Sequence, residues 1–205
     1  MDIVVKPKDD SVSWEDLADL LHESFKERLD QGLRFTCSFM SAQDIERKCK
    51  DAVVLIALDK DNDNLLAGTV AFKKLTESRA EHFNLAVSPS YKHAGVATKL
   101  LKALTDLAIQ NGCDHIVSDT ADRATSSVAW HKKNGFYPVS LRSFGSTNYY
   151  SILFRKQLKR HWLWSSPAWC AMCFSLTSTI YKLFRNSDGS LTRLGKVISF
   201  FKRQS

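Results

Sequence analysis

The stretch "VSPSYKHAGVATKLLKALTDLA", residues 87–108, places a proline turn and a glycine directly ahead of a long amphipathic segment that ends at Gly112. Its apolar residues recur at helical spacing and predict a helix. A loop that contains glycine, set between a strand and a helix, exposes backbone amides, and the helix N-terminus adds about half a positive charge. The Gly95 loop, with Lys92 and His93 at its rim, therefore suits an anion such as pyrophosphate. A single glycine before a helix can also serve only as a turn residue.

Strand and helix patterns fill the rest of the chain in a mixed order. Runs rich in β-branched residues predict strands at residues 3–6, 52–58, 65–75, 80–89, 114–121, 136–144 and 147–158. Segments with helical spacing predict helices after Ser13 and Ser41, after Gly95, and over residues 124–136. This order fits an α/β fold with a mixed sheet that carries helices on both faces.

Composition and charge narrow the class of protein. With 205 residues, 44% of them apolar and 25% charged, the chain is globular and long enough for one domain with appendages or two small domains. The formal charge of +7 favours anionic partners, but the sequence contains no recognisable nucleic-acid-binding module, so we expect no nucleic acid. The five cysteines are odd in number, and the N-terminus lacks a secretory signal. We therefore expect reduced thiols and a cytoplasmic location.

Two short patterns resemble metal sites but lack the ligands that such sites require. The aspartates within residues 59–63 alternate as in an EF-hand calcium loop, yet Asn64 and Val70 occupy the positions of the turn glycine and the closing glutamate. Cys170 and Cys173 form a CxxC pair, but no second pair or histidine follows at metal-binding spacing. We expect a hairpin loop, a packed helix and no metal.

Three motifs resemble the GNAT superfamily of N-acetyltransferases. Residues 92–97, "KHAGVA", resemble its pyrophosphate loop, whose pattern is Gln or Arg, any two residues, Gly, any residue, and Gly or Ala. Gly95 and Ala97 match, whereas a lysine stands at the Gln/Arg position. Residues 85–89, "LAVSP", resemble the central strand, and residues 126–136, "SSVAWHKKNGF", resemble the second motif that ends in Gly-Phe. The resemblance implies a GNAT-like acyltransferase fold.

This resemblance covers residues 1–160 and leaves residues 161–205 as a C-terminal, tryptophan-rich helical extension. Residues 162–181 carry no charge over 20 positions, but serines, threonines and Pro167 dilute the run too much for a membrane-spanning helix. We expect an arm that docks on the domain, on a second subunit or at a membrane interface. The basic, amphipathic residues 190–205 suit a homodimer interface or peripheral contact with an anionic membrane.

The resemblance also implies which residues bind acetyl-CoA. In the family the central strand bends at the position of Ala86 and Val87, and a backbone amide there binds the thioester carbonyl. At Val87 that amide would stabilise the negative oxygen of the tetrahedral intermediate. The implied CoA-binding residues are Ala86, Val87, Lys92, His93, Ala94, Gly95, Val96, Ala97 and Thr98.

The implied catalytic residues are an acid and a base. Family members commonly carry a tyrosine five residues before the Phe of Gly-Phe, where it protonates the departing thiolate, and this chain has His131 there. An imidazolium is a stronger acid than a phenol, although His131 could also serve only in packing. Glu81 occupies the position of the catalytic glutamate of histone-type relatives, and strand alternation places it on the face of Val87. His82 and Asp119 are the alternative bases.

The function implied is direct transfer of an acetyl group from acetyl-CoA to the primary amine of a small molecule. The cations and aromatics of residues 28–40, Arg34 among them, suit an amino sugar carried on a nucleotide, or they form an ordinary packed connection. A protein N-acetyltransferase is one alternative. A catalytically degenerate acyl-CoA-binding module is another, favoured by Lys92 and by the absence of the tyrosine.

Overall fold

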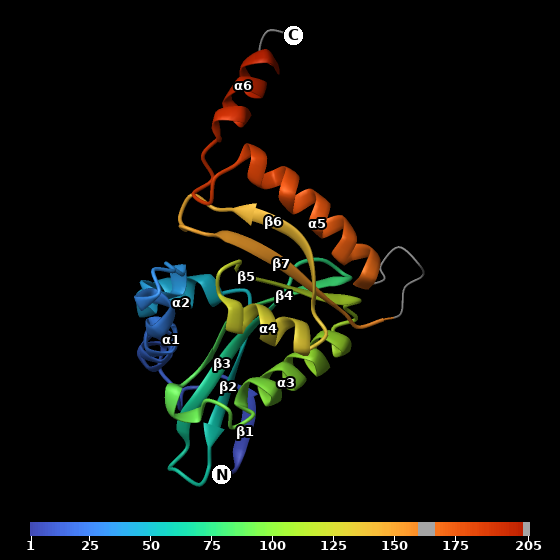
Figure 1. The fold of residues 1–205 in the computed structure, drawn as a ribbon. Helices are drawn as coiled ribbons and strands as arrows, with labels where there is room; N and C mark the ends of the chain where they lie inside the picture. Colours follow the sequence, from blue (N-terminus) through green and yellow to red (C-terminus); the bar gives the residue numbers. More distant parts are fainter. Residues whose placement is uncertain (160–166, 203–205) are drawn as a thin grey trace. The chain divides into compact units, whose positions relative to one another are not determined.

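The computed structural model describes residues 1–159 and 167–202, and its contacts divide the chain into two compact units (Figure 1). The first unit is Met1–Val117 and the second is Ser118–Ser205. The expected boundary at residues 160–161, with the tryptophans at 162 and 164, lies outside the described residues.

The elements follow the order that the sequence predicts. The first unit contains β1 (Ile3–Pro7), α1 (Trp14–Asp30), α2 (Ala42–Cys49), β2 (Val53–Asp59), β3 (Leu65–Lys74), β4 (Arg79–Val87), α3 (Val96–Gln110) and the start of β5 (His115–Ala121), with 3-10 turns η1 (Thr36–Ser38) and η2 (Pro89–Tyr91). The second unit continues with the end of β5, α4 (Thr125–Lys133), β6 (Tyr137–Ser143), β7 (Tyr150–Gln157), α5 (Pro167–Phe184) and α6 (Arg193–Lys202).

Two capping boxes start the first two helices. The Ser13 hydroxyl accepts a hydrogen bond from the Asp16 amide at 3.0 Å, and the Asp16 carboxylate accepts one from the Ser13 amide at 2.8 Å. Ser41 and Asp44 repeat this arrangement at the start of α2. Each box satisfies amides that the first helical turn leaves unpaired, so the sequence signal fixes where both helices begin.

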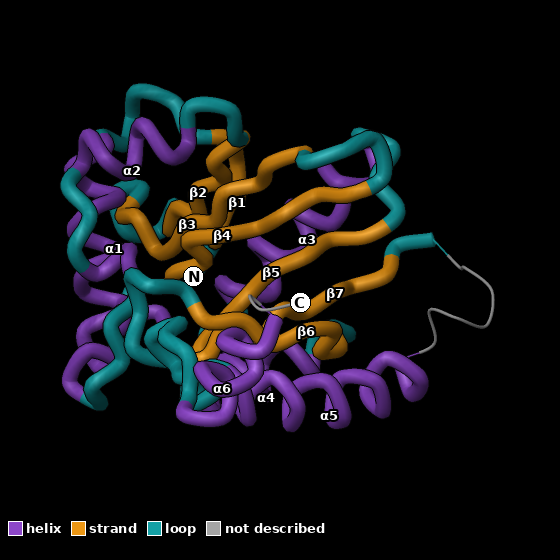
Figure 2. Tube along the Cα trace, turned by 90° about the horizontal axis from the view of Figure 1, so that it is seen from above, coloured by secondary structure: helices purple, strands orange, loops and turns teal. Residues whose placement is uncertain are grey.

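Hydrogen bonding orders the strands β1-β2-β3-β4-β5-β7-β6 in one mixed sheet (Figure 2). The β1–β2, β2–β3, β3–β4 and β6–β7 pairs are antiparallel, whereas β4 and β5 pair in parallel over residues 79–81 and 115–117. The mixed sheet and its helices confirm the expected α/β fold.

Helices cover both faces of the first unit's strands. A Cβ atom built on Gly68 of β3 would lie 3.0 Å from Val96 and 3.1 Å from Leu100, so α3 packs tightly on that face. On the other face the Lys48 ammonium of α2 lies 4.9 Å from the centre of the Phe83 ring in β4. Buried leucine, isoleucine and valine side chains fill both layers, among them Leu17, Leu21, Ile45, Ile56, Val70, Leu100 and Leu104.

In the second unit, α5 packs on the β6–β7 hairpin. The Tyr181 hydroxyl of α5 accepts a hydrogen bond from the Ser143 amide at 3.0 Å. The Tyr150 hydroxyl of β7 donates to the Arg185 carbonyl at 2.7 Å, just past the end of the helix. These contacts fix which face of α5 meets the hairpin. The expected helical extension is therefore present in the described residues.

Candidate functional site

The central strand β4 contains a break in register. Phe83 lies opposite Ala71 and Ala86 lies opposite Thr69, so β4 has one more residue than β3 between these two pairs. Asn84, within this stretch, has a φ of 54°. Asparagine is among the few residues that adopt this left-handed conformation readily. The stretch is therefore a β-bulge, a feature that bends a strand and redirects its side chains.

The bulge corrects one expectation from the sequence. The register shifts at residues 84–85, just before residues 86–87, where the resemblance places the bend. Simple alternation places Glu81 and Val87 on one face of the strand. Because the extra residue inverts the alternation, the Glu81 and Val87 side chains point to opposite faces.

The backbone of Val87 faces away from β3. Ser88 donates its amide to the Ala67 carbonyl at 2.9 Å, which makes the next pair, Val87 with Gly68, a pair that does not exchange hydrogen bonds. The Val87 carbonyl instead accepts a hydrogen bond from the Ser24 hydroxyl of α1 at 2.9 Å. The Val87 amide points to the same edge, where it can donate to a carbonyl oxygen.

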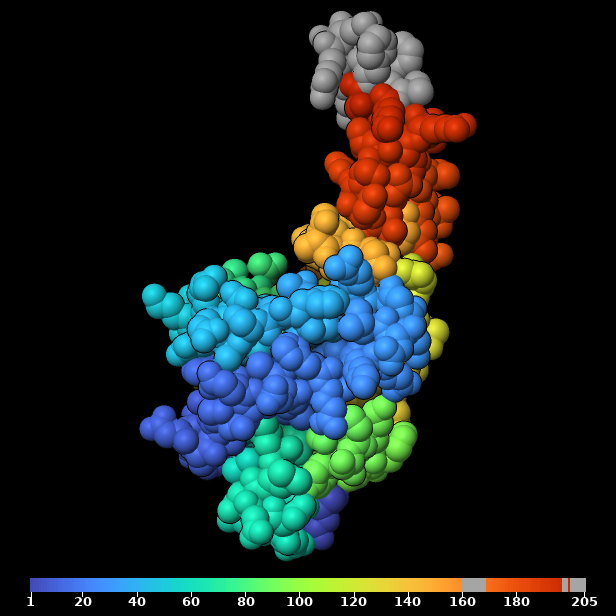
Figure 3. Space-filling view, turned by 90° about the vertical axis from the view of Figure 1, so that its left-hand side faces the viewer, coloured from blue at the N-terminus to red at the C-terminus, as the bar shows by residue number. Residues whose placement is uncertain are grey.

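The loop before α3 is anchored at Tyr91 and opens at Gly95. The buried Tyr91 hydroxyl donates a hydrogen bond to the Asp59 carboxylate at 3.1 Å and accepts one from the side-chain amide of Asn62 at 3.3 Å. The β2–β3 hairpin loop and this loop accordingly lie side by side on the surface (Figure 3). Gly95 caps α3 with a φ of 78°, and nothing lies within 4 Å of the position that a Cβ atom would take.

Three amides at the start of α3 remain available to a ligand. The Ala94 amide donates to a carbonyl of the preceding turn at 3.2 Å, and the Thr98 amide donates to the Gly95 carbonyl at 3.0 Å. Among the residues that the structure describes, the amides of Gly95, Val96 and Ala97 make no backbone hydrogen bond. The helix dipole adds positive potential at this end. The loop thus presents three neighbouring amide donors in a region of positive potential, an arrangement that suits an anion.

The expected cations at the rim are exposed. The Lys92 ammonium lies 2.7 Å from the Glu27 carboxylate of α1, and this hydrogen bond lowers the pKa of Glu27. His93 is exposed, with a φ of 66°. The Lys92 ammonium has three donors, so it can contact a phosphate oxygen beside Glu27 or in place of it.

The three candidate bases have different surroundings. Glu81 is half-buried, opposite Lys73 in β3 and Val117 in β5. The His82 side chain is 3% exposed, so it has little access to solvent or to an acceptor. The Asp119 carboxylate, in the second unit, accepts a hydrogen bond from the Ser151 hydroxyl at 2.6 Å. Glu81 and the exposed Asp119 both combine a carboxylate with access to solvent, whereas His82 does not.

His131 is held in the core of the second unit. Its side chain is 4% exposed, and its ring stacks on Phe154 with 4.7 Å between ring centres. Nδ1 lies 2.8 Å from the Ser127 carbonyl oxygen, and Nε2 lies 3.1 Å from the Ser118 hydroxyl. Since a carbonyl only accepts, Nδ1 carries a proton, and in the neutral ring Nε2 accepts from Ser118.

The segment expected to meet an acceptor divides into a packed part and an exposed part. The Arg28 guanidinium lies 4.9 Å from the Phe25 ring, and Phe25 in turn packs on Phe35 with 5.2 Å between ring centres. Arg34 and Phe39 are exposed, with 5.4 Å between the guanidinium carbon and the ring centre. Only this second pair has the access that an acceptor requires.

Three residues that the sequence did not single out shape these sites. Asn84 forms the bulge, Tyr91 anchors the anion-binding loop, and Ser118 holds Nε2 of His131. Asn84 carries a weak local signal, since an asparagine inside a β-branched run tolerates positive φ. The roles of Tyr91 and Ser118 depend on partners far away in the sequence.

A separate groove of about 770 Å³ lies between the β1–α1 connection, α2 and the start of β2. It shares no residue with β4 or the Gly95 loop. Within residues 1–159 and 167–202, no group of three or more His, Cys, Asp or Glu side chains is arranged to hold a metal ion. No helix of the described part is long and apolar enough to cross a membrane.

Comparison with known proteins gives a family match. The model of the acetyltransferase (GNAT) family matches residues 14–136, more than half of the chain. This region contains β4, the Gly95 loop and α4. No curated protein sequence is a significant match.

Solved structures of GNAT proteins share the fold at low sequence identity. A GNAT family acetyltransferase from Elizabethkingia anophelis with acetyl-CoA bound has a TM-score of 0.59 and 17% identity, over 76% of this chain and 98% of that chain. A Salmonella typhimurium protein, determined with its cofactor acetyl-CoA, has a TM-score of 0.57 and 16% identity, over 80% and 98%. The ribosomal-protein-S18-alanine N-acetyltransferase from Escherichia coli has a TM-score of 0.58 and 16% identity, over 78% and 97%.

Proposed function

Because the chain belongs to the acetyltransferase (GNAT) family, we propose that it transfers an acetyl group directly to the primary amine of a small molecule. The chain is an acyltransferase that uses acetyl-CoA as its donor. One observation carries the proposal: a single unit combines three unpaired amides at Gly95–Ala97 with a free-edge amide at Val87. These donors suit the two polar ends of an acyl-CoA, the pyrophosphate and the thioester carbonyl.

The Gly95 loop supplies the pyrophosphate site in this proposal. Its three amides and the dipole of α3 act together on the bridging and terminal oxygens. Space around Gly95 is open, as a phosphate group requires. Lys92 and His93 would add hydrogen-bond donors at the rim.

The Val87 amide supplies the hydrogen bond to the thioester carbonyl. The amine nitrogen attacks the carbonyl carbon and forms the new C–N bond, while the carbonyl oxygen becomes negatively charged. A fixed backbone donor stabilises that charge more than it stabilises the neutral carbonyl. The C–S bond then breaks, and its electrons leave with the thiolate of CoA.

Glu81 is our proposed base. An amine arrives as ammonium near neutral pH and must lose a proton before it can attack. The half-buried Glu81 lies on the face of β4 opposite the Val87 side chain, so it would act through a water molecule rather than by direct contact.

His131 is our proposed source of the proton that the thiolate takes up. With both ring nitrogens protonated, Nε2 would donate to the Ser118 oxygen, and the Ser118 hydroxyl proton would be free to pass on. As the amide forms, its nitrogen loses a further proton to solvent, and the ring takes up a proton from solvent to return to its starting state. Ser118 thus belongs to the proposal as the partner of His131.

A second candidate function is an acyl-CoA-binding module without turnover. The observation that favours it is the burial of His131, whose two nitrogens both have hydrogen-bond partners inside the unit.

The class of the acetyl acceptor is also part of the proposal. We favour a small-molecule amine, such as a nucleotide-linked amino sugar, because Arg34 and Phe39 offer an exposed cation beside an exposed ring. A protein amine is the alternative.

We propose a reducing, cytoplasmic environment, supported by five cysteines that are all free thiols. The extension at residues 161–205 would contact a second copy of the chain or a membrane.

The test is thiol release from acetyl-CoA by the purified protein. The acceptors are amino sugars, nucleotide-linked amino sugars and peptides with a free α-amine, and mass spectrometry identifies the acetylated product. We expect release with an amino sugar. Thiol release only with peptides would indicate that the acceptor is the amine of a protein. Tight CoA binding in calorimetry without release for any acceptor would favour the module.

A further inference from the structure

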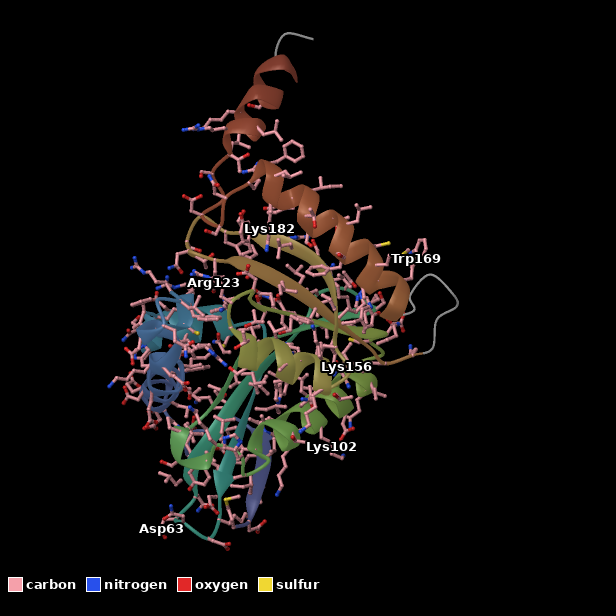
Figure 4. All side chains as sticks on the ribbon, viewed as in Figure 1. Asp63, Lys102, Arg123, Lys156, Trp169 and Lys182 are labelled. Atoms are coloured by element: carbon pink, nitrogen blue, oxygen red, sulfur yellow. The ribbon has the colours of Figure 1, made fainter. Side chains whose placement is uncertain are left out.

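The outward face of α5 carries an apolar stripe. Five large side chains, between 44% and 66% exposed, recur at intervals of three or four residues along the helix: Trp169, Met172, Leu176, Ile180 and Leu183. This spacing places them on one side of the helix. Figure 4 shows Trp169 pointing away from the β6–β7 hairpin.

The opposite side of α5 is already used for packing. Phe174, Ser178 and Tyr181 are half-buried, and the helix packs on β6. Tyr181 also lies within 2.9 Å of the Ser143 hydroxyl. The helix is therefore apolar on two opposed faces, which is typical of a helix covered on both sides. Among the residues of the second unit that the structure describes, only one of these faces is covered.

The charge of this region identifies what can cover the stripe. The second unit, residues 118–205, contains fourteen of the chain's 29 Lys and Arg residues and only three of its 22 Asp and Glu residues, Asp119, Asp122 and Asp188. At the C-terminal end of α5 and in α6, the Arg185, Arg193 and Lys196 side chains are exposed. An apolar stripe flanked by cations complements a surface that is apolar inside and anionic at its boundary.

A second copy of the chain fits this surface less well. Parallel two-fold pairing through α5 would bring the basic C-terminal ends of both copies together and is disfavoured by their charge, whereas antiparallel pairing would keep these ends apart. The stripe is also narrow. A single row of five side chains along an 18-residue helix is small beside the roughly 800 Å² per partner of a standard interface.

We propose that α5 lies flat on an anionic lipid bilayer. Its stripe enters the boundary between headgroups and acyl chains, Trp169 lies at headgroup level, and Arg185, Arg193 and Lys196 contact lipid phosphates. The described helices do not cross the membrane in this arrangement. Of the partners expected for residues 161–205, the membrane is the one that this surface fits. This binding does not depend on the acetyl-transfer chemistry.

Vesicle flotation with the full chain tests the stripe. The probes are phosphatidylcholine vesicles with and without phosphatidylserine. Leu176→Asn removes an apolar side chain from the stripe, and Ser175→Asn places the same residue on the adjacent, exposed flank. We expect Leu176→Asn to weaken binding to phosphatidylserine vesicles on the order of tenfold, since a buried leucine contributes about that much. Ser175→Asn should leave binding unchanged.

The cations are tested separately. Replacing Arg193 and Lys196 by glutamine should weaken binding to phosphatidylserine vesicles about fivefold per residue and should remove most of the salt dependence. The thiol of Cys173, exposed beside the stripe, offers a site for an environment-sensitive fluorophore whose emission should shift to the blue on vesicles.

Three results would overturn the proposal. These are no binding to phosphatidylserine vesicles, equal binding of Leu176→Asn and Ser175→Asn, or a dimer in sedimentation velocity that Leu176→Asn dissociates while vesicles stay unbound. Calorimetric binding of CoA by each variant reports separately on the first unit, so loss of lipid binding with intact CoA binding bears only on this surface.

Discussion

Nε2 of His131, in α4, lies 3.1 Å from the hydroxyl oxygen of Ser118, in β5 of the same unit. The other ring nitrogen lies 2.8 Å from the Ser127 carbonyl, so the ring orientation is fixed at both ends. If the ring supplies a proton, Ser118 is the group through which the proton leaves. If it does not, the same two bonds serve only to satisfy a buried polar ring.

We predict that His131→Phe lowers kcat between about tenfold and a thousandfold and leaves KM for acetyl-CoA unchanged. Ser118→Ala should lower kcat by a similar factor. The double variant should lose no more than either single variant, because the two residues act as one unit. The alkaline limb of the kcat profile should disappear in His131→Phe and should move upward in His131→Tyr, since a phenol ionises at higher pH.

The stability of the His131→Phe variant distinguishes a catalytic role of the histidine from a structural one. His131→Phe removes the hydrogen bonds of the ring to the Ser127 carbonyl and the Ser118 hydroxyl, which costs about 1–3 kcal/mol of unfolding free energy. A variant whose melting temperature falls while kcat and the alkaline limb stay as in the wild type would show a purely structural histidine.

The Gly95 loop has a matched control at the other end of the same helix. Gly95 has a φ of 78° and Gly112 has a φ of 76°, and neither has an atom within 4 Å of an added Cβ. Gly95→Val and Gly112→Val should therefore lose stability to a similar extent, on the order of 1–2 kcal/mol. Only Gly95→Val should weaken CoA binding in calorimetry, by more than tenfold, because its side chain enters the anion site. Equal CoA affinities for the two variants would contradict the proposal that this loop binds the pyrophosphate.

Local patterns account for the parts of the fold that the sequence predicts well. The boxes at Ser13 and Ser41 and the start of α3 at Gly95 each depend on residues within a few positions, so the printed sequence contains all their determinants. The family motifs locate the loop and α4 for the same reason.

The parts that the sequence misses depend on partners far along the chain. The bulge at Asn84 exists only in register with β3, and it inverts the alternation that links Glu81 to Val87. The surroundings of His131 in α4 are likewise set by Phe154, 23 positions away in β7. Periodicity within one segment contains no information about either pairing.

The pH dependence of stability should reflect the capping boxes. The pKa values of Asp16 and Asp44 are lowered because each carboxylate accepts hydrogen bonds from a serine hydroxyl and a backbone amide. A carboxylate with a lowered folded pKa contributes stability above its unfolded value of about 3.9, and this contribution is lost as the pH falls through the folded value. The effect is modest, because both carboxylates are exposed to solvent.

We therefore expect the melting temperature to fall below about pH 4, and to fall less steeply in the Asp16→Asn, Asp44→Asn double variant. Asp19→Asn, on the exposed side of α1, should retain the wild-type slope. At pH 7, Ser13→Ala should cost about 1 kcal/mol. Identical slopes for the double variant and the wild type between pH 3 and pH 5 would contradict the assignment.

The last prediction concerns Asn84, whose side chain accepts a hydrogen bond from the Lys48 ammonium at 3.3 Å. Asn84→Gly keeps the positive φ available and should retain kcat/KM within about threefold. Asn84→Val, a β-branched residue at a φ of 54°, should destabilise the chain by about 1–2 kcal/mol. It should also favour a strand without the bulge, which turns the Val87 amide toward β3 and removes it from the thioester. Loss of kcat/KM by more than tenfold is the expected result. Asn64→Val, at a φ of 58° in the exposed hairpin loop, carries the same backbone strain and should retain activity. If both valine variants lose stability alike and both retain kcat/KM, the bulge does not position the Val87 amide for catalysis.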